Sequence, residues 1–306
     1  MAESLKFIPA IQTFTPIINT DGSGLNKGYV MGKKLFVGVL LLFLCFSLSA
    51  QGGLRIVLEQ SADGFTIIRS EGSTRELAIP EAVNDIPIIA IGENAFIRSG
   101  LTMVTIPDTV IEIGEGAFSH NDLSVLVIGN NVETIGRRAF SNNRINDLTI
   151  GANVTSIGMG AFANNELENL VIPDSVTAIE PYAFFSNRLI HLTIPDGVTT
   201  IGEGAFSTNR LLSVVIGNSV EVIGDGAFFN NQLTSITIPD TITALGSRVF
   251  ESRLTRRGAA APVDYVTIGG EILYTTANNF DTFFAFTGRR AGTYTFSTRD
   301  GWAFEE

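Results

Sequence analysis

A 22-residue repeat constrains this chain more than any other feature of its sequence, because it runs from Leu101 to Phe250 without a slip. Phenylalanine marks the same place in every unit, at Phe96, Phe118, Phe140, Phe162, Phe184, Phe206, Phe228 and Phe250. A fixed period of about 20–50 residues indicates a solenoid, in which each unit is one turn that buries its apolar face only against its neighbours. The 306 residues are therefore predicted to form one elongated array, and not the two domains of roughly 150 residues that length alone suggests.

The repeating unit reads Leu-x-x-Leu/Val-x-Ile-Pro/Gly-Asp/Asn-x-Val-x-x-Ile-Gly-x-x-Ala-Phe-x-x-Asn-x. The alternation around Leu170 and Ile172 predicts a short strand, which the following Pro or Gly ends. Stacking of the units predicts a buried spine of phenylalanine rings. Asparagine also recurs every 22 residues, at Asn121, Asn143, Asn165, Asn187, Asn209 and Asn231. We expect this column to satisfy buried backbone groups at the last bend of each turn.

A short polar residue follows six of the seven predicted strands, at Asp108, Asn130, Asp174, Asp196, Asn218 and Asp240. Such side chains form turns by bonding to backbone groups. A ladder of cation sites is the alternative, but calcium takes six to eight converging oxygens, and stacked turns supply about one each. The turn-forming role is favoured, and no metal or cofactor is expected.

Two columns of residues point outward from the predicted strands. The first is β-branched throughout: Thr105, Val127, Thr149, Val171, Thr193, Val215 and Thr237. The second is mixed: Met103, Val125, Asp147, Asn169, His191, Ser213 and Ser235. The first suits a strand by propensity alone, whereas the second could contact a partner on a concave face. Asp147, Asn169 and His191 are the candidate partner-binding residues, although His191 could equally be an idle exposed side chain.

The amino-terminal region has the pattern of a secretory signal peptide. The basic run Met31–Lys34 precedes an apolar stretch, and Ser49-Ala50-Gln51 offers a small-residue cleavage site. About 14 apolar residues are too few to span a bilayer, which takes roughly 20. We predict that residues 31–50 are removed by cleavage near Ala50, and that residues 1–30 come from an upstream start and are unstructured.

The two ends of the array need caps, because a solenoid exposes an apolar cross-section at each end. Residues 51–76 contain a predicted hairpin around Ser61–Gly64, with the array following over residues 77–280. An insertion at residues 251–262 interrupts the 22-residue period. The pattern resumes at Tyr265, and a degenerate repeat that ends at Phe280 closes the array. Residues 281–306 are predicted to form a carboxy-terminal cap hairpin around Arg299–Gly301.

Composition and motif searches exclude several functions. A net charge of −11 opposes binding to nucleic acid, which needs cationic contacts to phosphate. Removing the first 50 residues, which hold four lysines against one Asp and one Glu, takes the charge to −13. His120 and His191 occupy different repeat positions, and the single cysteine, Cys45, lies in the signal segment. No catalytic triad or nucleophile motif is present, so no enzyme activity is expected.

The unit Leu-x-x-Leu-x-Ile-Pro-x-x-Val-x-x-Ile-Gly-x-x-Ala-Phe resembles the BspA-type leucine-rich repeats of bacterial surface proteins, over residues 54–280. The resemblance implies a right-handed leucine-rich repeat solenoid with a parallel β-sheet on one face, an irregular or 3-10 convex side, and hairpin caps at both ends. It also implies a secreted, cell-surface or periplasmic adhesin-like monomer that binds a protein or glycan, such as a host extracellular-matrix component. The alternative is a structural periplasmic or envelope protein with no dedicated ligand.

Overall fold

The computed structural model describes residues 45–49, 54–233, 235–239, 241–246, 248–250, 265–268, 271–274, 293–297 and 301–305. Four of the predictions fall wholly or mainly outside these residues: the upstream segment 1–30, most of the signal segment 31–50, the insertion at 251–262 and Phe280. These predictions stay untested.

The described residues form strands joined by turns, with no helix among them. The amino-terminal strands are β1 (Cys45–Ser49), β2 (Arg55–Gln60), β3 (Phe65–Glu71), β5 (Ala82–Val83) and β6 (Ile86–Ile91). The longer strands of the repeats are β4 (Glu76–Ala78), β7 (Met103–Thr105), β9 (Val125–Val127), β11 (Asp147–Thr149), β14 (His191–Thr193), β16 (Ser213–Val215) and β18 (Ser235–Ile238). The shorter strands are β8 (Glu112–Ile113), β10 (Thr134–Ile135), β12 (Ser156–Ile157), β13 (Ala178–Ile179), β15 (Thr200–Ile201), β17 (Val222–Ile223) and β19 (Ala244–Leu245). Four strands follow: β20 (Tyr265–Ile268), β21 (Glu271–Tyr274), β22 (Thr293–Ser297) and β23 (Gly301–Glu305).

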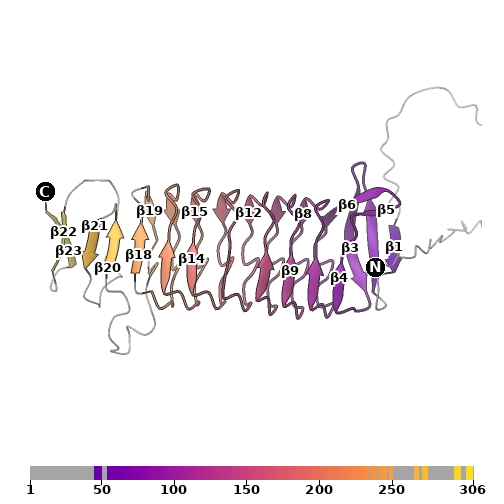
Figure 1. Cartoon of the computed structure of the whole chain (residues 1–306), viewed down its shortest axis with the longest axis horizontal. Coiled ribbons are helices and arrows are strands. Elements are labelled where there is room, and N and C mark those ends of the chain that lie inside the picture. Colours follow the sequence, from indigo (N-terminus) through magenta and orange to yellow (C-terminus); the bar gives the residue numbers. More distant parts are fainter. Residues whose placement is uncertain are drawn as a thin grey trace, which may run out of the picture.

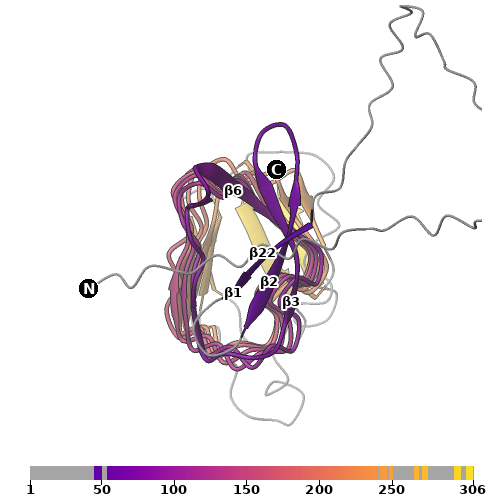
Figure 2. The ribbon, with the colours of Figure 1, turned by 90° about the vertical axis from the view of Figure 1, so that its right-hand side faces the viewer.

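The turns of the solenoid stack their strands into two parallel ladders, one of short and one of longer strands, so the predicted parallel-sheet solenoid is confirmed. The side expected to be irregular or 3-10 instead carries the ladder of two-residue strands, in which Ile113 pairs with Ile135 and Ile135 with Ile157. Neighbouring strands of any sheet lie about 4.7–4.9 Å apart, so both sides of the stack advance equally per repeat. The array is accordingly almost straight (Figure 1), and its turns overlap when seen end-on (Figure 2). The face expected to be concave is nearly flat.

The phenylalanine spine runs through the centre of the stack as predicted. Neighbouring rings are stacked along the whole series, from Phe96–Phe118 at 5.0 Å between centroids to Phe228–Phe250 at 5.7 Å. Phe118 and Phe162 are fully buried, with a buried alanine before each ring. Burying such a side chain contributes roughly 1.5–3 kcal/mol, so the spine is a main source of the stability of the array.

The asparagine column joins each turn to the one before it, which confirms its predicted role. The side-chain amide of Asn143 donates to the carbonyls of Phe118 and Phe140, each at 3.0 Å, and its Oδ1 accepts the Leu123 N–H at 3.1 Å. The same three bonds recur at Asn121, Asn165, Asn187, Asn209 and Asn231. One buried side chain thus satisfies two carbonyls and one amide that water cannot reach.

Two residues in each turn adopt the left-handed backbone region, four positions apart. Glycine fills the first position at Gly116, Gly160, Gly204 and Gly226, because it lacks a Cβ. Tyr182 occupies that position in its own repeat, at φ 59°. Asparagine is common at the second position, but Thr208 holds it at φ 61°. A β-branched residue is unusual in this region.

The amino-terminal hairpin predicted at residues 54–69 is present, as β2 pairs with β3 in antiparallel fashion. β3 pairs in parallel with β6, and β6 with β8, so this cap continues the short-strand ladder. Its edge differs from expectation: β1, inside the predicted signal segment, pairs antiparallel with β2. At the other end β20 joins β18 in parallel, which confirms the strand expected at Tyr265.

After β20, strand β21 runs antiparallel to it, so residues 271–274 do not follow the course expected for the degenerate repeat. β22 and β23 form the hairpin predicted in the tail.

The long-strand ladder is interrupted in one repeat, where the prediction of a strand around Leu170 and Ile172 is wrong. Strands β4, β7, β9 and β11 form one sheet, and β14, β16, β18, β20 and β21 form another. Between them, residues 168–172 form no strand. Asn169 lies within the interrupted segment and Asp147 at the equivalent position of the preceding repeat, and both residue types are depleted in strands. Two weak strand formers in adjacent repeats disfavour strand pairing at this point.

Candidate functional site: the long-strand face

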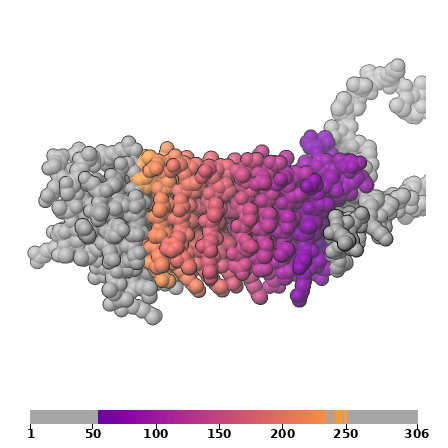
Figure 3. Space-filling model, viewed as in Figure 1, coloured from indigo at the N-terminus to yellow at the C-terminus, as the bar shows by residue number. Residues whose placement is uncertain are grey.

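The outward side of β4, β7, β9, β11, β14 and β16, with the unpaired segment 168–172, forms what we call the long-strand face. Its strands are held in strict register: Thr105 pairs with Val127, Val127 with Thr149, and Thr193 with Val215. This register places each outward side chain next to the equivalent side chain of the neighbouring repeat. Figure 3 shows the same regular repetition as ridges across the surface of the rod. Such a face offers a rigid row of side chains for contact with a large partner.

The three predicted partner-binding residues all lie exposed on this face. Asp147 begins β11 and His191 begins β14. His191 Nδ1 lies 2.9 Å from the hydroxyl of Ser213 in the next repeat. Asn169 lies on the segment without a strand. The structure thus places the three residues on one side of the array, with Asp147 in one sheet, His191 in the next and Asn169 in the break between them.

Exposed apolar side chains also mark the long-strand face. Val171 is 83% exposed, the highest value among the exposed large apolar residues, and Val215 is 56% exposed. Val127 and Met103 are also exposed on the same face. The β-branched column was predicted to point outward, and the exposure of Val127, Val171 and Val215 confirms this. Because strand propensity alone explained the column, its members were not among the predicted partner-binding residues.

Three of the polar turn residues, Asp108, Asn130 and Asp196, accept a backbone N–H of the next repeat. Asp108 Oδ1 accepts the backbone N–H of Asn130 at 2.6 Å, and Asp196 Oδ1 accepts that of Asn218 at 2.7 Å. Each carboxylate therefore fixes the turn that follows it, 22 residues further along the chain. These contacts agree with the predicted turn-forming role, although the bond crosses between repeats and is not local. Within the described residues, no group of three or more His, Cys, Asp or Glu side chains is placed to hold a metal ion.

Neither histidine is part of a recognisable catalytic group in the described part of the chain. His120 Nδ1 lies 2.7 Å from the hydroxyl of Ser119, and His191 contacts Ser213. No carboxylate among the described residues contacts either ring, so the third member of a Ser-His-Asp arrangement is missing there. The hydrogen bond from Tyr182 to Glu203 raises the pKa of the phenol, with burial adding to the effect. It lies in a turn and faces no histidine or serine nucleophile that could use it.

The stacked two-ladder turns with their phenylalanine and asparagine columns define a leucine-rich repeat solenoid without helices in its described part. A model of the BspA type leucine rich repeat region, in six copies, matches residues 73–188 and 133–256, which together cover more than half of the chain. The chain belongs to this BspA-type leucine-rich repeat family.

Two solved structures illustrate the similarity. A leucine rich cell surface protein from Faecalibacterium prausnitzii A2-165 is 26% identical over 68% of this chain and 73% of its own, with a TM-score of 0.42. A leucine-rich repeat protein from T. pallidum is 19% identical over 66% of this chain and 90% of its own, also with a TM-score of 0.42. No protein of curated function matches the sequence. In the described residues, no helix has the length and apolar character needed to cross a bilayer.

Proposed function

We propose that this chain is a secreted or cell-surface protein-binding module, adhesin-like in its mode of action, that contacts its partner through the long-strand face. The observation that carries the proposal is the exposure of Val171, 83%, on a rigid face that also exposes Val127 and Val215. Apolar side chains gathered on one exposed face indicate a protein contact, since solvation of each is unfavourable until a partner covers it. The net charge of −11 favours a basic or neutral partner.

The test is direct binding of the full chain to a panel of purified extracellular-matrix proteins, measured by biolayer interferometry. Val171→Asp should weaken binding of the partner found by about tenfold or more, because a charge would be buried against an apolar contact. Replacing Asp147, Asn169 and His191 together by alanine should weaken it as well. Ile111→Asp is the matched control: Ile111 is 45% exposed but precedes β8 in the other ladder. Equal loss in Val171→Asp and Ile111→Asp, or no partner in the panel, would favour the structural envelope role instead.

We also propose that translation starts near Met31 and that the signal segment is cleaved near Ala50. The support is the charge and hydrophobicity pattern of residues 31–50. Cleavage would remove β1 and leave the outer edge of β2 open. Mass spectrometry of the protein recovered from its own cells tests this: a mature terminus at or near Gln51 supports the proposal, and a terminus upstream of β1 overturns it.

A further inference from the structure

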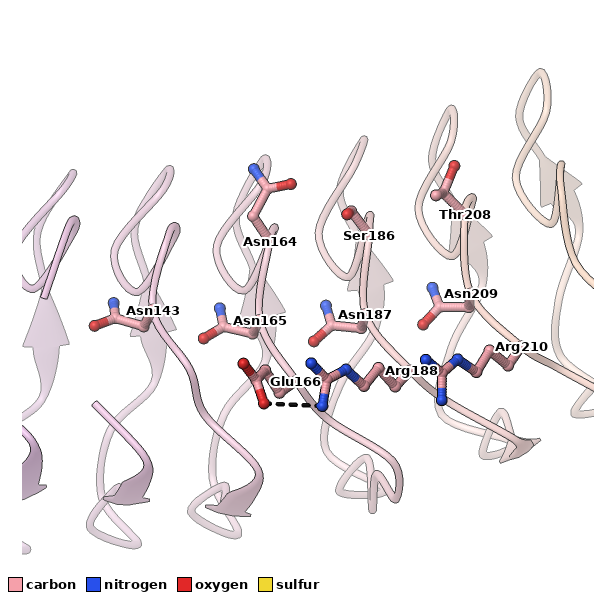
Figure 4. Close-up of a pocket in the computed structure, with 10 residues that line it drawn as sticks. All are labelled: Asn143, Asn164, Asn165, Glu166, Ser186, Asn187, Arg188, Thr208, Asn209 and Arg210. Atoms are coloured by element: carbon pink, nitrogen blue, oxygen red, sulfur yellow. Dashed lines mark ion pairs between the residues drawn. The ribbon is translucent and has the colours of Figure 1, made fainter. Parts of the chain in front are cut away.

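A shallow hollow of about 510 Å³ lies on the side of the array where the asparagine column runs (Figure 4). Its lining is entirely polar, and consists of Asn143, Asn164, Asn165, Glu166, Ser186, Asn187, Arg188, Thr208, Asn209 and Arg210. The lining carries two arginines and one glutamate, a positive balance in a protein of net charge −11. A hollow of this polarity suits a hydrophilic anion, and it is distinct from the long-strand face.

The positive charge of the hollow comes from one position that recurs every 22 residues and alternates between acid and arginine until Arg210. Arg144 pairs with Asp122 at 3.2 Å, and Arg188 pairs with Glu166 at 2.9 Å, each reaching back to an acid in the preceding repeat. Arg210 occupies the same position one repeat further, but the residue it reaches toward is Arg188 (Figure 4). Among the described residues, Arg210 has no ion pair or side-chain hydrogen bond. An anion from outside the chain would supply the partner that the column lacks here.

Two hydroxyl side chains line the same hollow at left-handed backbone positions, across the asparagine column from Arg210 (Figure 4). Ser186 and Thr208 have φ 56° and 61°, whereas Asn164 and Asn230 fill the same position in the flanking repeats. Asparagine tolerates this conformation well and a β-branched threonine poorly. The hydroxyl of Ser186 has no hydrogen bond within the described residues, and the two contacts of the Thr208 hydroxyl are both long, at 3.4 Å. Both hydroxyls are therefore available to a ligand.

The backbone around the hollow has few groups left for a peptide to pair with. The N–H groups of Ser186, Thr208 and Arg210 already donate to Ser207, Phe229 and Leu189, at 2.8–3.0 Å. The side chains of Asn165, Asn187 and Asn209 are likewise occupied by main-chain groups. A ligand bound here must therefore contact the guanidinium of Arg210 and the hydroxyls of Ser186 and Thr208. These groups match a ligand rich in hydroxyls that carries a carboxylate.

We propose that this hollow binds a carboxylated saccharide. The guanidinium of Arg210 would take the carboxylate in a bidentate pair, the geometry that suits this side chain best. The hydroxyls of Ser186 and Thr208 would bond to ring hydroxyls on the adjacent side. This site works independently of any protein held on the long-strand face, so either can fail without the other.

The test is isothermal titration of the full chain with an α-1,4-linked galacturonic acid trimer, with a neutral galactose trimer and a capped triglutamate peptide as comparison ligands. Only the acidic saccharide should bind. Arg210→Gln should weaken its binding about tenfold or more, the effect of losing a charge-assisted hydrogen-bonded pair. Thr208→Asn and Ser186→Asn, which install the residue of the flanking repeats, should weaken binding while leaving the fold intact.

Arg144→Gln provides the matched control, because Arg144 holds the same column position but lies outside the hollow and already pairs with Asp122. It should leave binding unchanged. Three results would overturn the proposal: no binding of the acidic trimer, equal loss in Arg144→Gln and Arg210→Gln, or equal binding of the triglutamate peptide. The last would instead assign the hollow to an acidic protein segment.

Discussion

The ring of Phe140 stacks on the ring of Phe162 with their centroids 5.3 Å apart and their planes within 9° of parallel. Each ring comes from a separate turn, so this contact links two repeats that are 22 residues apart in the chain. The spine extends the same relationship from Phe96 to Phe250. Loss of one ring therefore weakens two interfaces between repeats at once.

We expect Phe162→Ala to lower the free energy of unfolding by about 3–5 kcal/mol, the usual cost of a large cavity in a packed core. In a solenoid, where stability is a sum of repeat and interface contributions, this loss should also split unfolding into separate transitions. Chemical denaturation followed by circular dichroism measures both effects. Phe162→Leu, which keeps most of the volume, should lose clearly less. An unchanged denaturation midpoint in Phe162→Ala would contradict the spine.

A second prediction concerns the asparagine column. Asn165→Ala removes the donor to the carbonyls of Phe140 and Phe162 and the acceptor for the Ile145 N–H, all in the buried interior. Each group left without a partner costs roughly 1–3 kcal/mol, so the variant should be strongly destabilised in urea. Asn153→Ala is the control, since Asn153 is exposed and its side chain bonds only to Asn131. Similar stability of the two variants would show that the hydrogen bonds of Asn165 do not stabilise the array.

Much of this architecture follows from the sequence because it depends on side chains that recur at one period. The phenylalanine and asparagine columns are read directly from the spacing, and their contacts repeat because every turn is nearly identical. The second ladder could not be read in this way. Its strands are two residues long, as at Thr134–Ile135, and such a pattern is too short to separate from a turn.

The candidate sites were harder to predict, because they lie where a repeat carries a residue that differs from the residue at the same position in its neighbours. The interruption at Asn169 lies next to Asp147 of the preceding turn, and each residue alone looks like an ordinary surface position. The unpaired Arg210 is informative only once the structure shows that Arg144 and Arg188 reach back to acids. The effect of such a difference depends on contacts with the neighbouring repeat, and these contacts are visible only in the structure.

Tyr182 and Gly204 provide a third prediction. A Cβ at Gly204 would lie 2.5 Å from Cε1 of Tyr182, and Gly204 itself has φ 55°. Gly204→Ala should therefore destabilise the array through both a clash and a left-handed backbone, the second worth about 1–2 kcal/mol. Combining it with Tyr182→Gly should remove the clash and leave only the backbone contribution. A double-mutant cycle in urea measures the coupling, and strict additivity of the two changes would show that the ring does not restrict residue 204.

The last prediction is a pH effect at Tyr182, whose phenol donates a hydrogen bond to the carboxylate of Glu203. This bond, with burial and the negative charges of Glu203 and Asp225, raises the pKa of Tyr182 above its ordinary value of 10.0. A raised pKa means that the folded state favours the neutral phenol, so its contribution to stability is complete below about pH 10 and is lost as the pH rises through the folded-state pKa. The side chain is well exposed to solvent, and the effect on stability should be small.

Tyrosinate absorbance, recorded as the difference between the wild-type protein and Tyr182→Phe, should show Tyr182 titrating above pH 10.0. Glu203→Gln removes the charge and should move the pKa of Tyr182 back toward its ordinary value. The denaturation midpoints of wild type and Tyr182→Phe should converge as the pH passes that titration, because ionisation destroys the hydrogen bond that distinguishes them. Titration of Tyr182 at or below its ordinary pKa, or no response to Glu203→Gln, would show that this hydrogen bond does not control the group.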